Sequence, residues 1–218
     1  MNKKSLPETT IRNVVASFKL EPVLNLRRIR EAFQKECFFE TIQDRRYTFR
    51  VVALRTKKPQ ATFLIYRTGK VVCVGAKTIE TAQHSDQYLA NRLNKAGIST
   101  RIMQPSTIQN IVATTALKEP IDLEKLVTKT QTTRQIQTMY EPEQFPAAIL
   151  KISINQNTKA TVLLFSSGKL VIAGLKTTEQ IDQALEKLIA QINARIDGFG
   201  ILKGMKPFTA EDELDTHD

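Results

Sequence analysis

The stretch 61-ATFLIYRTGKVVCVGAK-77 recurs as 160-ATVLLFSSGKLVIAGLK-176, shifted by 99 positions. An earlier stretch, 11-IRNVVASFKL-20, recurs as 108-IQNIVATTAL-117, shifted by 97 positions. The two motifs keep the same order in both halves, and the small difference between the shifts fits a change in loop length. The sequence therefore predicts a tandem duplication of about ninety residues, so one structural unit is used twice.

Each copy is expected to contain a strand, a short helix, extended segments that end in a Gly-Lys hairpin, and a long helix. β-branched residues predict the strand, Asn25 and Asp122 are good N-caps for the short helix, and apolar residues at helical spacing predict the long helix. The expected strand, short helix and long helix lie at residues 13–20, 26–33 and 79–96 in the first copy and at residues 110–117, 123–130 and 181–196 in the second. This order of elements indicates an α+β fold with antiparallel sheet.

The hairpin 162-VLLFSSGKLVIAG-174 is apolar on both faces of its strands. One face is expected to pack against the long helix. The other face would be an exposed apolar sheet, and an exposed patch of this size marks a binding surface. The sequence therefore predicts two equivalent sheets with helices on one side and an apolar face open to a partner.

The 218-residue chain is basic, with 32 Lys+Arg against 22 Asp+Glu and a formal charge of +10. Residues 1–105 carry 20 Lys+Arg and 8 Asp+Glu (+12), and residues 106–218 carry 12 and 14 (−2). Five of these carboxylates lie in the last nine residues, AEDELDTHD. A basic body with a short acidic tail is a common charge profile of proteins that meet polyanions.

Several classes of protein are excluded by what the sequence lacks. No apolar run is long enough for a membrane span, and none follows the N-terminal lysines as in a secretory signal. Cys37 and Cys73 are too few for a disulfide framework or a four-cysteine zinc site. A nucleophile–base pair of either cysteine with His84 is a weaker interpretation than a buried, inert thiol. Neither an enzyme nor a cofactor or metal is expected.

Several of these motifs together resemble the TATA-box-binding protein family. They are the pair IRNVVAS and IQNIVAT, the pair LIYRTGKVVCVGAK and LLFSSGKLVIAGLK, and the segment 139-MYEPEQFPAAI-149. The resemblance implies a saddle in which two pseudo-symmetric repeats form one curved antiparallel sheet with helices on the convex face. The implied N-terminal extension, first repeat, second repeat and acidic tail cover residues 1–9, 10–105, 106–198 and 199–218.

The resemblance implies a general transcription initiation factor that binds TATA-like, A/T-rich promoter DNA in the minor groove. Such a factor kinks the DNA by aromatic intercalation and nucleates assembly of the preinitiation complex. A regulatory paralogue that acts mainly through protein partners is the alternative, because Tyr66, Val74 and Ala173 depart from the usual Phe, Thr and Thr. A DNA-repair glycosylase is less well supported because no helix-hairpin-helix segment follows residue 198, and a tandem RNA-recognition pair because its aromatic strand motif is missing.

The resemblance assigns DNA-contacting roles to matched positions in the two copies. The intercalating aromatic residues are Phe49, Tyr66, Phe145 and Phe165. The minor-groove base contacts are Asn13, Val15, Leu64, Val72, Val74, Asn110, Val112, Leu163, Val171 and Ala173. The phosphate contacts are Arg55, Lys57, Lys70, Lys77, Lys151, Lys169 and Lys176.

The resemblance also raises protein partners. The segment 140-YEPEQF-145 is similar to the surface that receives transcription factor IIB, with Glu141 and Glu143 as acidic contacts. Transcription factor IIA, TBP-associated factors and RNA polymerase machinery stay open as partners, as does a homodimer in the absence of DNA. In the helix at 78–96, uncharged residues replace the family's basic stripe at Gln83, Gln87, Tyr88 and Asn91. The nucleus is the leading expectation for the location, with archaeal cytoplasm or a viral origin left open.

Overall fold

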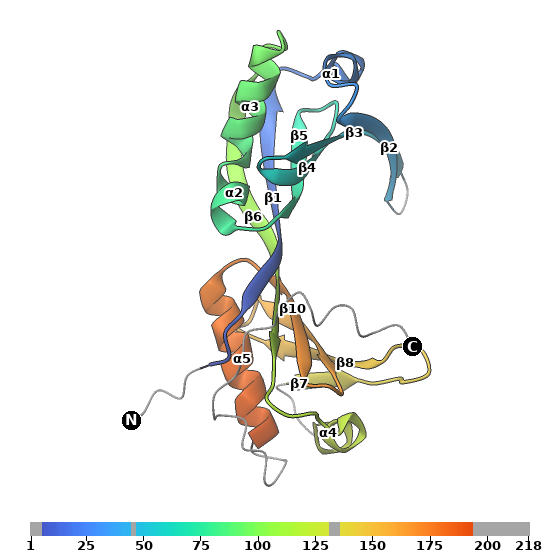
Figure 1. The fold of residues 1–218 in the computed structure, drawn as a ribbon, viewed down its shortest axis with the longest axis vertical. Helices are drawn as coiled ribbons and strands as arrows, with labels where there is room; N and C mark the ends of the chain where they lie inside the picture. The colour runs from blue at the N-terminus through green and yellow to red at the C-terminus, as the bar shows by residue number, and fades with distance from the viewer. Residues whose placement is uncertain (1–5, 45–46, 131–135, 194–218) are drawn as a thin grey trace. The chain divides into compact units, whose positions relative to one another are not determined.

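A computed structural model of the chain describes residues 6–44, 47–130 and 136–193 (Figure 1). The side chains of residues 40–44 and 47–49 are not among those described. The expected acidic tail at residues 199–218 lies outside the described residues. The chain divides into two compact units, one of residues 12–110 and one of residues 1–11 and 111–218.

The described part of the first repeat contains five strands and three helices. They are β1 (Thr10–Glu21), α1 (Leu26–Ala32), β2 (Cys37–Asp44), β3 (Tyr47–Lys57), β4 (Gln60–Ile65), β5 (Lys70–Ala76), α2 (Ile79–Gln83) and α3 (Ser85–Lys95). The second repeat contains five strands and two helices in the described residues. They are β6 (Arg101–Ala116), α4 (Leu123–Thr130), β7 (Ile136–Met139), β8 (Ala147–Ser153), β9 (Lys159–Phe165), β10 (Lys169–Leu175) and α5 (Thr178–Asn193).

The strand order repeats the duplication seen in the sequence. The ten strands follow one hydrogen-bonded order, β2-β3-β4-β5-β1-β6-β10-β9-β8-β7. Strands β1 to β5 correspond one by one to strands β6 to β10, so the second half of the order is the first half reversed. The expected α+β fold with two equivalent repeats of antiparallel strands is confirmed. The two sheets predicted from the hairpins are halves of one sheet, because β1 and β6 are neighbours in the strand order.

The prediction of one long helix over residues 79–96 is wrong in one respect. The segment forms two helices, α2 and α3, which meet at His84. The Ser85 hydroxyl donates to the Ala82 carbonyl (2.7 Å), and the Asp86 carboxylate accepts from the backbone N–H of Ser106 (3.0 Å). These side chains compete with the regular helical ladder and fasten the start of α3 to β6. The break therefore depends on a contact with a strand twenty residues further along the chain.

In each repeat, one face of the sheet packs against the closing helices of that repeat. In the first repeat, Phe63 of β4 is 1% exposed, and its ring stacks on Tyr88 of α3 with centroids 5.8 Å apart. In the second repeat, α5 buries the apolar face that the sequence predicts, made of Ile181, Ala184, Leu185, Leu188, Ile189 and Ile192. Fully burying one such aliphatic side chain contributes about 1.5–3 kcal/mol, so this face anchors the helix. The expected last member of the stripe, Ile196, lies outside the described residues.

Candidate nucleic-acid interface

The predicted base-contact residues lie on the sheet face opposite the closing helices. Along β1, residues 14, 16, 18 and 20 are buried, whereas Asn13 and Val15 are only half-buried. The same alternation places Leu64, Val72 and Val74 in the first repeat, and Val112, Leu163, Val171 and Ala173 in the second, among the half-buried residues. We call this face of each repeat the open face.

Strand register shows how these residues are grouped, because directly opposed residues of antiparallel neighbours share a sheet face. One row of the first repeat contains Phe38, Ala53, Leu64, Val72 and Ser17. The equivalent row of the second repeat contains Met139, Ile149, Leu163, Val171 and Thr114. Each row is apolar over four of its five positions, with Ser17 or Thr114 as the polar member, so each open face presents an apolar band that crosses four strands.

A second row on the same face lies two residues further along each strand. It contains Arg55, Thr62 and Val74 in the first repeat and Lys151, Thr161 and Ala173 in the second. Val74 and Ala173 replace the family's usual threonines, yet each is flanked in its row by a threonine on the neighbouring strand. A hydroxyl group is therefore available next to each replaced position.

The side chain of Asn13 has a defined orientation. Its Oδ1 accepts a hydrogen bond from the backbone N–H of Gly75 (2.8 Å), at a bulge where Gly75 has φ +84°. Because the amide oxygen is engaged, the NH2 group is the end that would meet a ligand on the open face. The minor groove presents acceptors at every A·T pair, so a donor suits it. Asn110 is half-buried at the equivalent position of β6, and Gly174 has a matching φ of +88°.

The predicted intercalating residues form one described pair. Phe145 is 39% exposed, and its ring meets that of Phe165 edge to face with centroids 6.3 Å apart. Tyr66 follows the last residue of β4 and is half-buried, and Phe49 lies in β3 opposite Ile42. The side chain of Phe49 is outside the described set. The second-repeat pair is thus brought together, and intercalation itself stays a prediction.

The Gly-Lys turns place two predicted phosphate contacts at strand ends, with Lys70 as the first residue of β5 and Lys169 as the first residue of β10. A Cβ added at Gly69 would overlap the carbonyl oxygen of Leu20, and Gly69 has φ +86°, so glycine is required there. The backbone N–H of Leu20 also donates to the Gly69 carbonyl (2.9 Å). This close approach fixes the position at which Lys70 begins β5.

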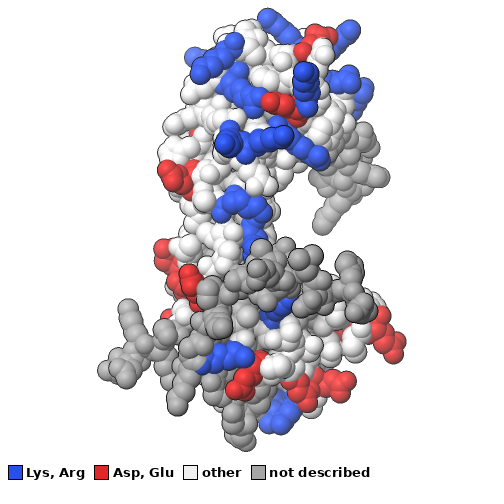
Figure 2. Space-filling model, in the orientation of Figure 1, with Lys and Arg blue, Asp and Glu red and all other residues white. Residues whose placement is uncertain are grey.

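The other predicted cations lie at the surface. Arg55, Lys57, Lys77, Lys151 and Lys176 are exposed. The Arg55 guanidinium lies 4.7 Å from the centroid of the Phe38 ring, and Lys77 Nζ donates to the carbonyl of Arg12 (3.0 Å). Figure 2 shows Lys and Arg side chains gathered on the unit that holds the first repeat. This agrees with the excess of positive charge in the first half of the sequence.

The predicted acidic contacts occupy a tight turn before β8. The Glu141 carbonyl accepts from the backbone N–H groups of Gln144 (2.9 Å) and Phe145 (3.0 Å). Glu141 and Glu143 are both exposed. The turn therefore presents two carboxylates beside Phe145, and their role toward a partner stays a prediction.

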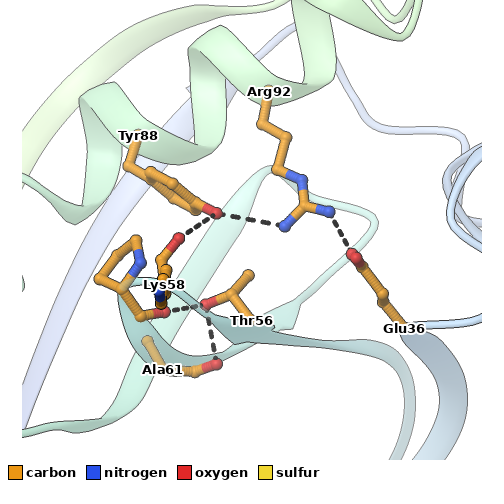
Figure 3. A network of polar contacts seen from close by, with 7 residues as sticks. Glu36, Thr56, Lys58, Ala61, Tyr88 and Arg92 are labelled. Atoms are coloured by element: carbon orange, nitrogen blue, oxygen red, sulfur yellow. Dashed lines mark hydrogen bonds and ion pairs between the residues drawn. The ribbon is translucent and has the colours of Figure 1, made fainter.

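On the helix side of the first repeat, a polar network joins three segments (Figure 3). Arg92 of α3 pairs with Glu36 and donates to the Tyr88 hydroxyl (3.2 Å), which donates in turn to the Lys58 carbonyl (3.4 Å). The Thr56 hydroxyl closes the β3–β4 turn through the carbonyls of Pro59 and Ala61. Tyr88 therefore lies at a position where the family resemblance implies a basic residue, and its side chain instead makes hydrogen bonds within the repeat.

The cysteines are buried. Burial raises the pKa of the Cys73 thiol to about 11, and Cys37 is also shifted upward, chiefly by burial. Among the described residues, no group of three His, Cys, Asp or Glu side chains could hold a metal ion. Of the described helices, none is long and apolar enough to cross a membrane.

Comparison with known proteins agrees with this architecture. The family model described as "Transcription factor TFIID (or TATA-binding protein, TBP)" matches residues 8–96 and 105–194, which are the two repeats. The chain therefore belongs to the TATA-binding protein family, a family of DNA-binding transcription factors rather than of enzymes.

Individual relatives support the assignment. TATA-box-binding protein 2 of Methanosarcina mazei is 35% identical over 192 residues, which cover 88% of this chain and 96% of the relative. The TATA-box-binding protein of Pyrobaculum calidifontis is 35% identical over 186 residues, 85% of this chain and 86% of the relative. The solved structure of Methanococcus jannaschii TBP has a TM-score of 0.70 and 32% identity, covering 87% of this chain and 100% of that one. These relatives are archaeal, so the expectation of a nuclear location has no support from them.

Sequence reasoning missed part of the open face. It did not find Phe38, Ile149 and Met139, which continue the apolar rows, or Thr62 and Thr161, which flank the replaced threonines. Strand register is the signal that identifies them, and the sequence does not fix the register of β2 and β7.

Proposed function

We propose that this chain is an archaeal-type general transcription factor that binds A/T-rich promoter DNA in the minor groove through the open faces of its two repeats. The observation that carries this proposal is the pair of equivalent apolar rows, each with Leu and Val at its centre. An apolar face suits the minor groove, which offers few base-specific donors and acceptors. The predicted cations beside the rows supply contacts to phosphates.

The proposal includes kinking of the duplex by the aromatic pairs. Unstacking a base step costs a few kcal/mol, which is offset by the wider contact that bent DNA allows, and this family is itself a standard example. Phe145 and Phe165 support this step, because their rings are partly exposed and meet at the end of the open face. Tyr66 at the equivalent place adds a hydroxyl group to the first wedge.

The assembly step would use the turn that carries Glu141 and Glu143. Its two exposed carboxylates fit a basic surface, and a transcription factor IIB-like protein is the partner that we propose for it. A regulatory paralogue with altered DNA specificity is the second candidate, favoured by Val74, Ala173 and the Tyr88–Arg92 network. The two candidates differ in whether the open face binds TATA-containing DNA.

The deciding experiment measures binding and bending together. A labelled TATA duplex and a scrambled duplex of equal composition are titrated with the protein across a salt series, and bending is followed by circular permutation. We expect preferential binding and bending of the TATA duplex. Phe145→Ala with Phe165→Ala should remove the kink at one end of the site and so reduce the total bend, whereas Phe33→Leu, a half-buried aromatic residue after α1, should leave the bend unchanged. Binding without any bend would refute kinking, and equal affinity for both duplexes would favour the paralogue.

A further inference from the structure

Strand β2 carries two adjacent aromatic residues that lie on opposite faces of the sheet. Phe38 opposes Ala53 and belongs to the open-face row with Leu64 and Val72. Phe39 opposes Val52 and therefore lies on the side of the closing helices. Both rings are half-buried. The two residues have the same chemistry and the same strand but face different surroundings.

Each ring is covered by arginine. The Arg55 guanidinium lies 4.7 Å from the centroid of Phe38. The guanidinium groups of Arg30 and Arg50 each lie 5.0 Å from the centroid of Phe39. Such contacts are attractive because the face of an aromatic ring carries a partial negative charge, which attracts a cation. On the open face, the contact restrains a long side chain that would otherwise sample many rotamers.

Arg55 is also fixed at its backbone. Its N–H donates to the Glu36 carbonyl of the chain segment next to β2 (2.8 Å). Its backbone bonds the segment before β2 and its guanidinium contacts Phe38 of β2. The position of Arg55 in the second open-face row, beside Thr62, is therefore fixed before any ligand binds. A guanidinium with a planar fork of donors suits a phosphate, and restraining it beforehand lowers the entropy cost of binding.

Phe38 also widens the apolar band. It lies two strands beyond Leu64, which at the usual strand spacing is about 9–10 Å. The equivalent residue of the second repeat is Met139, which is 55% exposed, and the residue equivalent to Arg55 is Lys151. Lysine is a mobile point charge, whereas a stacked arginine is directional. The two repeats thus differ in how firmly the cation of the second row is held in place before a phosphate binds: Arg55 is restrained by Phe38, whereas Lys151 is the flexible equivalent.

We propose that Phe38 is a positioning residue for DNA binding, which holds the Arg55 guanidinium ready for a phosphate at the edge of the minor groove in the first repeat. This inference rests on the proposed function, since it needs DNA on the open face. It assigns a role to the edge strand β2, and it implies that the first repeat has the more strongly restrained phosphate contact.

The test compares Phe38→Leu with Phe39→Leu as the matched control and adds Arg55→Gln and the double variant Phe38→Leu/Arg55→Gln. Affinity for a labelled TATA duplex is measured at four or more salt concentrations, and urea unfolding reports stability. Phe38→Leu should weaken binding about two- to fivefold, the equivalent of an exposed cation–π contact. Arg55→Gln should lower the salt slope by about 0.9, the value for one phosphate. In the Arg55→Gln background, Phe38→Leu should cause no further loss.

Each outcome decides the proposal. Phe39→Leu should change stability about as much as Phe38→Leu and leave DNA affinity and salt slope unchanged. If both leucine variants weaken DNA binding equally, or if the losses from Phe38→Leu and Arg55→Gln simply add, Phe38 has only a structural role and the proposal is overturned. If the unmodified protein does not prefer the TATA duplex, it is the proposed function that fails.

Discussion

Replacing Asn13 by aspartate separates the two tasks that the structure gives to one amide group. The Oδ1 atom accepts from the Gly75 N–H at 2.8 Å, and the NH2 group is the end directed to a ligand. Aspartate keeps an oxygen for Gly75 and replaces the donor by a second acceptor. The substitution therefore preserves the fold-supporting bond and changes only the chemistry offered to DNA.

The size of each effect follows from these contacts. A charged acceptor serves the Gly75 N–H at least as well as the amide, so the free energy of unfolding should change by less than about 0.5 kcal/mol. Toward DNA, a carboxylate would face the acceptors of A·T pairs. Leaving a buried polar group unpaired costs about 1–3 kcal/mol, and more for a charged group. Affinity for a TATA duplex should fall about tenfold to more than hundredfold.

Urea unfolding and fluorescence anisotropy with a labelled TATA duplex measure the two effects on the same preparation. Asn13→Leu serves as the comparison, because it removes both the acceptor and the donor and should lose stability as well as affinity. Asn110→Asp should repeat the loss of affinity at the equivalent position. Binding of Asn13→Asp within twofold of the unmodified protein would show that the amide does not face the groove.

Three further predictions concern the core, the phosphate contacts and the thiols. Leu188→Ala, at a fully buried position of α5, should lower the free energy of unfolding by about 2–5 kcal/mol in urea, whereas exposed Glu186→Ala should change it little; a loss below about 1 kcal/mol for Leu188→Ala would contradict the packing described. Lys70→Gln and Lys169→Gln should each lower the salt slope of DNA binding by about 0.9, and an unchanged slope would remove those lysines from the interface. In a Cys37→Ser background, Cys73 should resist iodoacetamide at pH 8 until the protein unfolds, since burial raises its pKa to about 11. Because the unfolded thiol ionises near its ordinary value of 9.0, the stability contributed by Cys73 should decline as the pH rises from about 9 toward 11.

Local signals made much of the fold predictable. The duplicated motifs gave both repeats, the Gly-Lys turns gave the hairpins, and α4 has the bounds that its pattern predicts. The apolar stripe of α5 is buried as expected. These features depend on residues close together in the chain, where turn chemistry and periodicity act directly.

Features set by distant contacts were not predictable. The break at His84 depends on Ser106, and β6 begins at Arg101, ahead of the expected strand at 110–117. The membership of Phe38 and Met139 in the open-face rows depends on the register of the edge strands. Register across an irregular connection is fixed by tertiary packing, which a single sequence does not reveal.

Strand β6 belongs to both compact units, since the division of the chain falls between Asn110 and Ile111. The unit that holds most of the first repeat thus includes the opening residues of the second, and Asp86 and Ser85 are bonded to Ser106 within that shared stretch. A fragment ending at residue 105 would lack Ser106 and expose the backbone of β1 along the edge where β6 pairs. Unpaired strand edges recruit other chains. We therefore expect two copies of a lone repeat to pair through their exposed β1 edges, in the way that β1 and its equivalent β6 are neighbours in this chain, so that the fragment forms a symmetric dimer.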